Sequence, residues 1–171
     1  MEFFDALQSR HSVRAYAKTP VEAEKLDQIF EAIEQAPSAG NLQAFEVYLI
    51  THTEQRAKLA VAALGQAFLA QAPVVLVFCA HAARLAERYA QRGVNLYSVQ
   101  DATIACTYAM LAATALGLST VWVGAFDEDA VGRIINAPQA HRPVAMLPVG
   151  YPAEEPRVRG RRNLTDFVHR I

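Results

Sequence analysis

Apolar residues recur at helical spacing near the start of the chain. Residues 3–9 place their apolar side chains on one side of a short predicted helix. A second helix is predicted with Thr19 as N-cap, Pro20 at the first helical position and Glu22 completing a capping box. Pro37 ends it. The apolar stripe of this second helix consists of Leu26, Ile29, Phe30 and Ile33.

Runs of β-branched and aromatic residues predict strands further along the chain. FEVYLIT (45–51) has the composition of a strand. APVVLVFCA (72–80) is short and continuously apolar, which predicts a central strand buried on both faces. TVWVGAF (120–126) and RPVAMLPVGYP (142–152) are predicted as two more strands, and the second leads into a tail rich in Pro and Arg.

Helices are predicted between these strands. Thr53 is a candidate cap for a helix that runs to about Gly65, and residues 81–92 form a polar, surface helix. A long alanine-rich helix begins at Ser98 and ends before Gly117, which fits the C′ position. Its small side chains allow close approach, either as the core helix or in a tight subunit contact. Asp127 caps one further helix.

Composition narrows the class of protein. The 171 residues are 53% hydrophobic with a net charge of −1, so we expect one domain spanning residues 1–171. A balanced charge argues against nucleic acid or a membrane surface as partner, and no apolar run is long enough to span a bilayer. Cys79 and Cys106 lie in apolar segments, typical of buried, reduced thiols in a cytoplasmic protein.

The segment RHSVRAY (10–16) contains the first candidate chemistry. In an extended backbone, Arg10, Ser12 and Arg14 share one face and converge, as an anion site requires. The tail adds Arg157, Arg159, Arg161 and Arg162. These form either a solvated arm or a source of one further arginine that folds back toward Arg10, because the guanidinium fork suits phosphate oxygens.

Common catalytic motifs do not occur in the sequence. The five histidines are scattered, none at the i, i+4 spacing of a helical metal pair, and there is no CxxC. Zinc is therefore not expected. A GxGxxG fingerprint, a phosphate-binding P-loop and a GxSxG elbow do not occur either. If the protein is an enzyme, a bound cofactor must supply its reactive atom.

Four segments together carry a resemblance to a known family. RHSVRAY, APSAGNLQAFEVYLI (36–50), GLSTVWVGAF (117–126) and VAMLPVGYPAEEPRVRGRRNLTDFV (144–168) resemble, in this order, the nitroreductase family of FMN-dependent oxidoreductases. The resemblance covers nearly the whole chain and suggests a short, minimal member. It implies an α+β domain with a mostly antiparallel sheet flanked by helices, and an intertwined homodimer with FMN at the interface.

The resemblance assigns the arginine cluster to the FMN phosphate. Arg10, His11 and Ser12 belong to the implied cradle, where charge-assisted hydrogen bonds satisfy the phosphate oxygens. Arg161 best matches the second phosphate ligand, with Arg159 and Arg162 as neighbouring candidates. Arg14 either makes a further phosphate contact or lies toward the pyrimidine end of the flavin, where a cation stabilises the reduced ring.

The PSAGN loop resembles the family segment that the partner subunit lays against the flavin ring. Pro37, Ser38 and Ala39 are implied to contact the ring, and Asn41 to hydrogen-bond its edge or the ribityl chain. A generic helix-terminating turn uses the same residue types. Many family members have Pro-Trp where this chain has Ala44 and Phe45, which leaves the conformation of the loop open.

Two weaker matches complete the implied site. The small residues Gly124 and Ala125 match the position at which a backbone N–H faces flavin N5, although a glycine also simply turns a strand end. Gln66 matches a position near the ribityl or pyrimidine edge of the flavin.

The resemblance also implies a reaction, ping-pong transfer of hydride from NADH or NADPH through flavin N5 to a nitroaromatic, quinone or similar conjugated small-molecule acceptor. No side chain then needs to act as acid or base. The alternative is a flavin-binding module, a carrier or redox-responsive interaction protein, without appreciable turnover.

Overall fold

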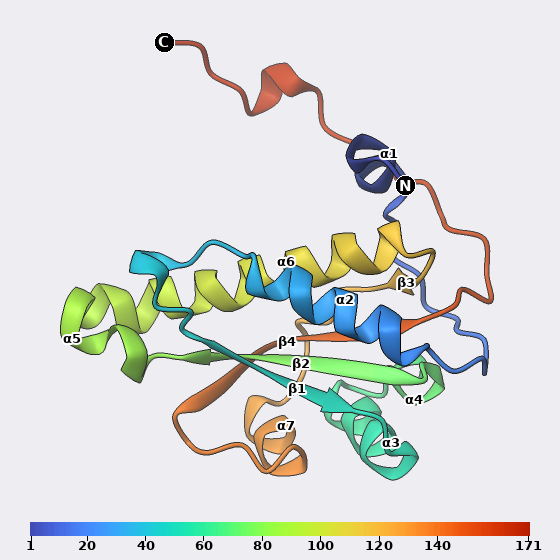
Figure 1. The fold of residues 1–171 in the computed structure, drawn as a ribbon, viewed down its shortest axis with the longest axis horizontal. Helices are drawn as coiled ribbons and strands as arrows, with labels where there is room; N and C mark the ends of the chain where they lie inside the picture. The colour runs from blue at the N-terminus through green and yellow to red at the C-terminus, as the bar shows by residue number, and fades with distance from the viewer.

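A single antiparallel sheet organises the chain, which the computed structural model describes over residues 1–171. Its strands follow the order β1-β2-β4-β3, as Figure 1 shows. The strands are β1 (Phe45–Ile50), β2 (Val74–His81), β3 (Ser119–Thr120) and β4 (His141–Gly150). β2 lies inside the sheet and is buried along nearly its whole length, so the prediction of a central strand is confirmed.

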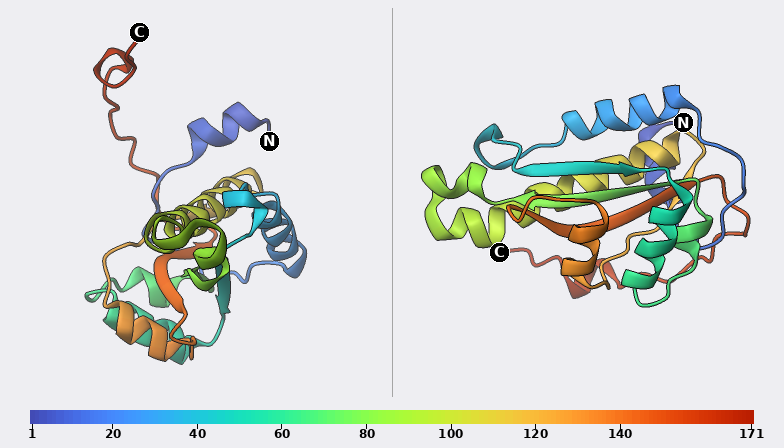
Figure 2. Two further views of the ribbon diagram at one scale, coloured as in Figure 1. Left: turned by 90° about the vertical axis from the view of Figure 1, so that its left-hand side faces the viewer. Right: turned by 90° about the horizontal axis from the view of Figure 1, so that it is seen from below.

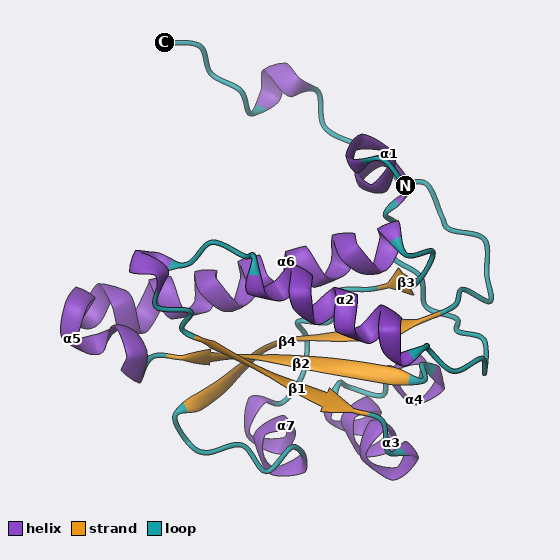
Figure 3. Ribbon diagram, in the orientation of Figure 1, coloured by secondary structure: helices purple, strands orange, loops and turns teal.

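Helices cover both faces of the sheet (Figure 3). They are α1 (Phe3–Ser9), α2 (Ala23–Glu34), α3 (Thr53–Ala62), α4 (Phe68–Gln71), α5 (Ala83–Arg92), α6 (Ser98–Ala115) and α7 (Glu128–Ile134). In Figure 1, α2 and α6 lie above the sheet and α3 and α7 below it. The α+β class with a mostly antiparallel sheet, expected from the resemblance, is therefore confirmed.

Alternation along β2 builds the two halves of the core, because successive side chains of a strand point to opposite faces. Leu76 and Phe78 belong to the cluster with α2 and α6. Val77 and Cys79 belong to the cluster with α3 and α7. Cys79 and Cys106 are both buried with free thiols, as the sequence indicates, and burial raises the pKa of the Cys79 thiol to about 12.

Several local signals act as predicted. The Asp127 carboxylate accepts a hydrogen bond from the Ala130 amide, 2.9 Å away, and so caps α7. Gly117 follows α6 with φ of +75°, the left-handed conformation that a glycine adopts at little cost. α5 matches the predicted polar helix. No helix is both long and apolar enough to cross a membrane.

The predicted N-terminal caps of two helices are wrong. α2 begins at Ala23, with Glu22 at its N-cap position and no side-chain cap, so Thr19 and Pro20 precede the helix. The Glu22 carboxylate instead accepts a hydrogen bond from the Tyr151 hydroxyl. Thr53 is the first residue of α3 rather than its cap.

The segment 120–126 is mostly not a strand. Ser119 and Thr120 alone pair with β4, and beyond them only an isolated bridge joins Val123 to Met146. Its alternation still holds as far as Val123, because Val121 and Val123 are buried while Trp122 between them is only partly buried. Gly124 and Ala125, which follow, are both exposed.

Candidate functional site

Residues 10–16 follow the predicted extended path. Ser12 forms a parallel bridge with Thr120, and the Val13 amide donates to the Thr120 carbonyl at 3.1 Å. The Val13 side chain is buried against Tyr16, so the residues on either side of it face outward. This alternation fixes the direction of Ser12 and Arg14.

The tail is held against this segment by backbone hydrogen bonds. The Ala17 amide donates to the Tyr151 carbonyl and the Ala153 amide donates to the Ala15 carbonyl, each at 2.9 Å. Tyr16 also forms an antiparallel bridge with Pro152. Two segments more than a hundred residues apart in sequence therefore run side by side, and the tail arginines begin directly after them.

These contacts create a polar cavity of about 560 Å³ without a hydrophobic residue in its lining. The predicted phosphate residues Arg10, His11, Ser12, Arg14 and Arg161 all line it, together with Glu154, Arg157 and Arg159. Arg162, one of the alternatives for the tail ligand, lies outside the lining and donates instead to the Asp166 carbonyl.

The electrostatics of the cavity favour an anion. It gathers five arginines around one carboxylate, Glu154, which accepts a hydrogen bond from the Arg14 amide. None of the five guanidinium groups takes part in an ion pair within the chain. Unpaired guanidinium forks of this kind match the geometry and charge of a phosphate group.

Gln66 and the turn containing Gly124 and Ala125 lie together. The Gln66 side-chain amide donates to the Ala125 carbonyl at 3.1 Å and to the Ala63 carbonyl at 2.9 Å. Thr120, which pairs with Ser12, precedes Gly124 by four residues, a span of at most about 14 Å. The structure thus brings this turn within reach of the arginine cavity. Thr120 Oγ1 is itself a buried polar atom without a hydrogen-bond partner.

The loop 37–41 lies elsewhere. Pro37, Ser38 and Ala39 line a second cavity of about 640 Å³ with Tyr89, Tyr97, Gln100, Asp101, Thr103 and Ile104. The Ser38 hydroxyl accepts from the Gln43 amide at 2.9 Å, and Asn41 is exposed with φ of +57°. Asn is one of the few residues besides Gly that tolerates this left-handed backbone.

Asp101 holds this loop and is the main residue that sequence reasoning missed. Its carboxylate accepts from the Ala39 amide at 2.9 Å and from the Ala44 amide at 3.3 Å, and it is 2% exposed. An isolated acidic residue in an otherwise small and apolar helix is the signal that could have found it, because a buried carboxylate needs hydrogen-bond donors.

The segments that line the two cavities lie at opposite ends of α6, the loop 37–41 near its start and residues 10–16 near its end (Figure 1). Asp101 stands near the start of this helix, and Thr120 follows its end. A helix of 18 residues is about 27 Å long at the usual rise per residue. Within one chain, Pro37, Ser38, Ala39 and Asn41 are therefore remote from Arg10 and Arg161.

The fold and the cavity define an α+β protein whose terminal segments meet around a cavity lined by five arginines. Comparison with known proteins places the chain more closely: the nitroreductase family model matches residues 7–68 and 59–151. The chain belongs to the nitroreductase family.

Individual relatives agree with this assignment. The chain is 34% identical over 166 residues to the FMN reductase [NAD(P)H] of Bacillus subtilis, covering 90% of this chain and 67% of that protein. It is 31% identical to a putative NADH dehydrogenase/NAD(P)H nitroreductase of Methanothermobacter thermautotrophicus, covering 97% and 84%. The solved structure of B. megaterium NfrA2 superposes with a TM-score of 0.91 at 30% identity, covering 99% and 74%.

Proposed function

We propose that this protein is an FMN-dependent oxidoreductase that takes electrons from NADH or NADPH and reduces a nitroaromatic, a quinone or a similar conjugated acceptor. The observation that carries the proposal is the convergence of Arg10, Ser12 and Arg14 with Arg161 in one anion cavity. The names of the relatives, an FMN reductase and an NAD(P)H nitroreductase, support the same cofactor and donor.

The phosphate of FMN is the group that fits the arginine cavity. Arg10 and Arg161 offer paired N–H donors, and the Ser12 hydroxyl adds a further donor. His11 lies at the same wall. Bound FMN supplies the hydride-transfer chemistry, and this explains why the chain has no catalytic motif of its own.

Arg14 shares the lining with the other phosphate residues, which supports a second phosphate contact over a place at the pyrimidine end. Its backbone amide is fixed by Glu154. The single carboxylate therefore holds the peptide of Arg14 while the guanidinium remains available to the ligand.

The turn at Gly124 and Ala125 offers backbone N–H groups to the flavin ring, since both residues are exposed. Gln66 acts as a positioning residue in this proposal, because its side-chain amide nitrogen is used on the Ala63 and Ala125 carbonyls. An amide that fixes the turn in this way orients the donors before the cofactor arrives.

The site is completed by a second copy of the chain. The loop with Pro37, Ser38, Ala39 and Asn41 lies a full helix length from the arginine cavity, so only the loop of a partner can reach the same cofactor. The tail leaves the body as an exposed arm (Figure 2). Val158 is 82% exposed and Phe167 is 51% exposed, as expected of an arm that packs on another subunit.

A second apolar surface supports the homodimer. α1 and α6 border a groove of about 470 Å³ whose lining is entirely hydrophobic, formed by Met1, Phe3, Ala6, Ala32, Tyr108, Leu111, Ala112 and Ala115. The small residues of α6 allow a second helix to approach closely. Sedimentation of the FMN-loaded protein should give a dimer mass at micromolar concentration, and a monomer that retains flavin would contradict the shared site.

Anaerobic stopped-flow mixing with NADH and with NADPH tests the activity directly. The oxidised-flavin absorbance should bleach within seconds with at least one donor and recover when a nitroaromatic or quinone is added. Bound flavin that stays oxidised with both donors would favour the alternative, a flavin-binding module without turnover.

Arg10→Ala tests the phosphate assignment. Loss of charge-assisted hydrogen bonds should weaken FMN binding about 10- to 100-fold, measured by fluorescence titration of apoprotein. Arg170→Ala is the matched control, because Arg170 is exposed and outside the cavity lining. Equal FMN affinity in the two variants would overturn the assignment.

A further inference from the structure

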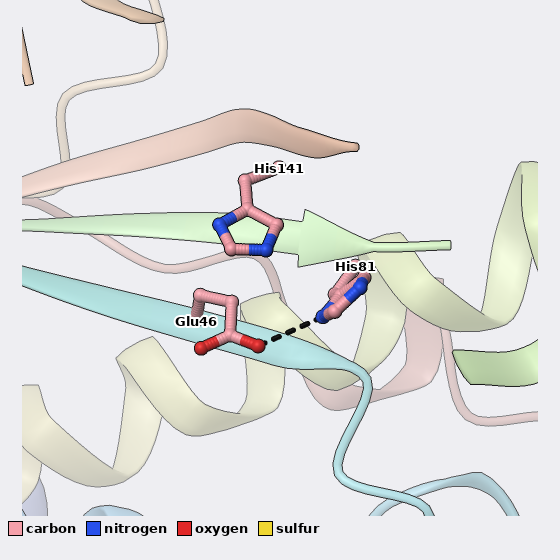
Figure 4. Close-up of side chains that lie close together, drawn as sticks. All are labelled: Glu46, His81 and His141. Atoms are coloured by element: carbon pink, nitrogen blue, oxygen red, sulfur yellow. Dashed lines mark hydrogen bonds and ion pairs between the residues drawn. The ribbon is translucent and has the colours of Figure 1, made fainter. Parts of the chain in front are cut away.

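Three potential metal ligands meet on one face of the sheet, away from the arginine cavity. Glu46 on β1, His81 on β2 and His141 at the start of β4 each offer one ligand atom, and these atoms all lie within 4.8 Å of one another. Figure 4 shows the three side chains turned toward a common point. The geometry points to a binding site for a divalent transition-metal ion, for which we take Zn²⁺ as the probe.

The register of the strands brings the ligands together. His81 stands directly opposite His141, and Glu46 stands opposite Cys79, two residues before His81 and therefore on the same face. Three strands thus contribute one ligand each. A site built on paired strands holds its ligands more firmly than one built on loops.

A β-bulge is needed for this arrangement. Phe78 pairs with Ala145 whereas Cys79 pairs with Pro143, so Val144 is the extra residue of β4. With regular pairing beyond Phe78, Arg142 would stand opposite His81. The bulge shifts β4 by one residue and places His141 there instead, in the way that bulges re-aim side chains at functional sites.

The contacts of the two imidazoles suit metal binding. His81 Nδ1 lies 2.8 Å from Glu46 Oε1, so one nitrogen and one carboxylate oxygen are already directed at each other. His141 Nδ1 lies 2.6 Å from the Tyr48 hydroxyl, which leaves Nε2 to face the cluster (Figure 4). A hydrogen bond to the second ring nitrogen fixes the orientation of a ligating histidine.

Charge and access also fit the ion. Two neutral imidazoles and one carboxylate are a known ligand set for zinc, which leaves the fourth position to water. The side chain of His81 is 22% exposed and that of Glu46 is 36% exposed, so an ion can enter from solvent. The adjacent cation, Arg142, is paired with Glu128 at 2.9 Å and its charge is partly neutralised.

Binding requires only side-chain movements. Ligands about 2.1 Å from a tetrahedral ion lie about 3.4 Å apart. His81 Nδ1 and Glu46 Oε1 must therefore separate slightly from 2.8 Å, and the most distant pair must approach from within 4.8 Å. Rotations about χ1 and χ2 provide shifts of this size without a change in the strands.

No local spacing in the sequence reveals this cluster, because its ligands come from three different strands. Glu46 and His81 lie 35 positions apart in the chain.

Competition with a chromophoric chelator tests the proposal on FMN-loaded, full-length protein stripped of metal. One equivalent of Zn²⁺ should bind per chain with micromolar or tighter affinity, and Co²⁺ should give the visible absorption of a four-coordinate site. His141→Gln and Glu46→Gln should each weaken Zn²⁺ binding at least tenfold. Tyr48→Phe, which removes only the bond to Nδ1, should weaken it about 10-fold.

His52→Gln is the matched control, because His52 is an exposed histidine before α3 and outside the cluster. Circular dichroism and retained FMN verify that each variant is folded. If the unmodified protein binds no Zn²⁺ at about 100 µM ion, a concentration well above the expected dissociation constant, the proposal is overturned. Equal affinity in the His141→Gln and His52→Gln variants overturns it as well.

Discussion

Arg56 and the five arginines of the arginine cavity differ in burial and in hydrogen bonding. Arg56 is buried, and its guanidinium donates to the carbonyls of Thr51, Ala70 and Ala72 and to the Thr53 hydroxyl. Burial lowers its pKa. The five cavity arginines have no ion pair within the chain and line open space.

The comparison distinguishes a charged side chain that stabilises the fold from charged side chains that are available to a ligand. A buried guanidinium is tolerated when its donors are satisfied, and it then stabilises the segments that it connects. Arg56 connects α3 with the residues that lead into β2. The cavity arginines have no ion pair within the chain, so their clustering supports the proposed anion site.

Arg56→Ala tests the structural role of Arg56 and should have the largest effect on stability. It leaves three carbonyls without their donor, and we expect a loss of about 3–5 kcal/mol in the free energy of unfolding. Urea denaturation measures it. Arg56→Lys keeps the charge without the fork and should recover part of the loss. A cost below about 1 kcal/mol would place Arg56 among ordinary surface charges.

Asp101→Ala should have the next largest effect, because two amides of the 39–44 loop lose a buried acceptor. We expect a loss of about 2–4 kcal/mol in the free energy of unfolding. Asp101→Asn keeps one acceptor oxygen and should cost less. Hydrogen exchange should also rise at Ala39 and Ala44, and unchanged exchange there would show that the loop is held by other contacts.

Arg161→Ala tests whether a cavity arginine serves the ligand and not the fold. It should weaken FMN binding by about 1.5–3 kcal/mol and leave the urea midpoint of the apoprotein unchanged, since Arg161 has no ion pair in the chain. Arg162→Ala is the matched neighbour outside the cavity and should leave affinity within about twofold. Equal losses in both variants would mean that the tail acts only through its net charge.

The parts of the molecule that the sequence predicted are those whose signals are local. The continuous apolar run of residues 72–80 identified β2, the Asp127 cap identified α7, and the two-residue spacing of Arg10, Ser12 and Arg14 identified one wall of the cavity. Arg161 was chosen among the tail arginines as the phosphate ligand only through the family resemblance. The position of the tail depends on backbone pairing between residues 15–17 and 151–153, which no local pattern in the sequence shows.

The features that the sequence did not predict depend on distant partners. Arg56 lies in a helix with an ordinary polar composition, and its three carbonyl partners follow from how α3, α4 and β2 pack. The Glu46, His81 and His141 cluster depends on strand order and on one bulge. The capping box predicted for Thr19 and Glu22 does not form, and the Glu22 carboxylate instead accepts a hydrogen bond from Tyr151, far along the chain.

Tyr151→Phe should give the smallest effect, because it removes only the hydrogen bonds between one hydroxyl and the side chains of Glu22 and Lys25. The Tyr151 hydroxyl donates to Glu22 at 2.7 Å and accepts from Lys25 Nζ at 2.6 Å, joining the end of β4 to the start of α2. Chiefly this hydroxyl, followed by a backbone hydrogen bond at Glu22 and the charge of Lys25, holds the pKa of Glu22 below its ordinary value of 4.5.

A carboxylate with a lowered pKa contributes stability above its ordinary pKa and loses it as pH falls through the folded value. Tyr151→Phe should therefore raise the pKa of Glu22 toward 4.5, measured by carboxyl NMR. Its stability should differ from that of the unmodified protein fully above pH 4.5, and the difference should disappear as pH falls through the folded pKa. Glu54, whose pKa is lowered by Lys58 instead, should not move. An unchanged Glu22 titration would mean that the backbone hydrogen bond at Glu22 and Lys25 set its pKa without Tyr151.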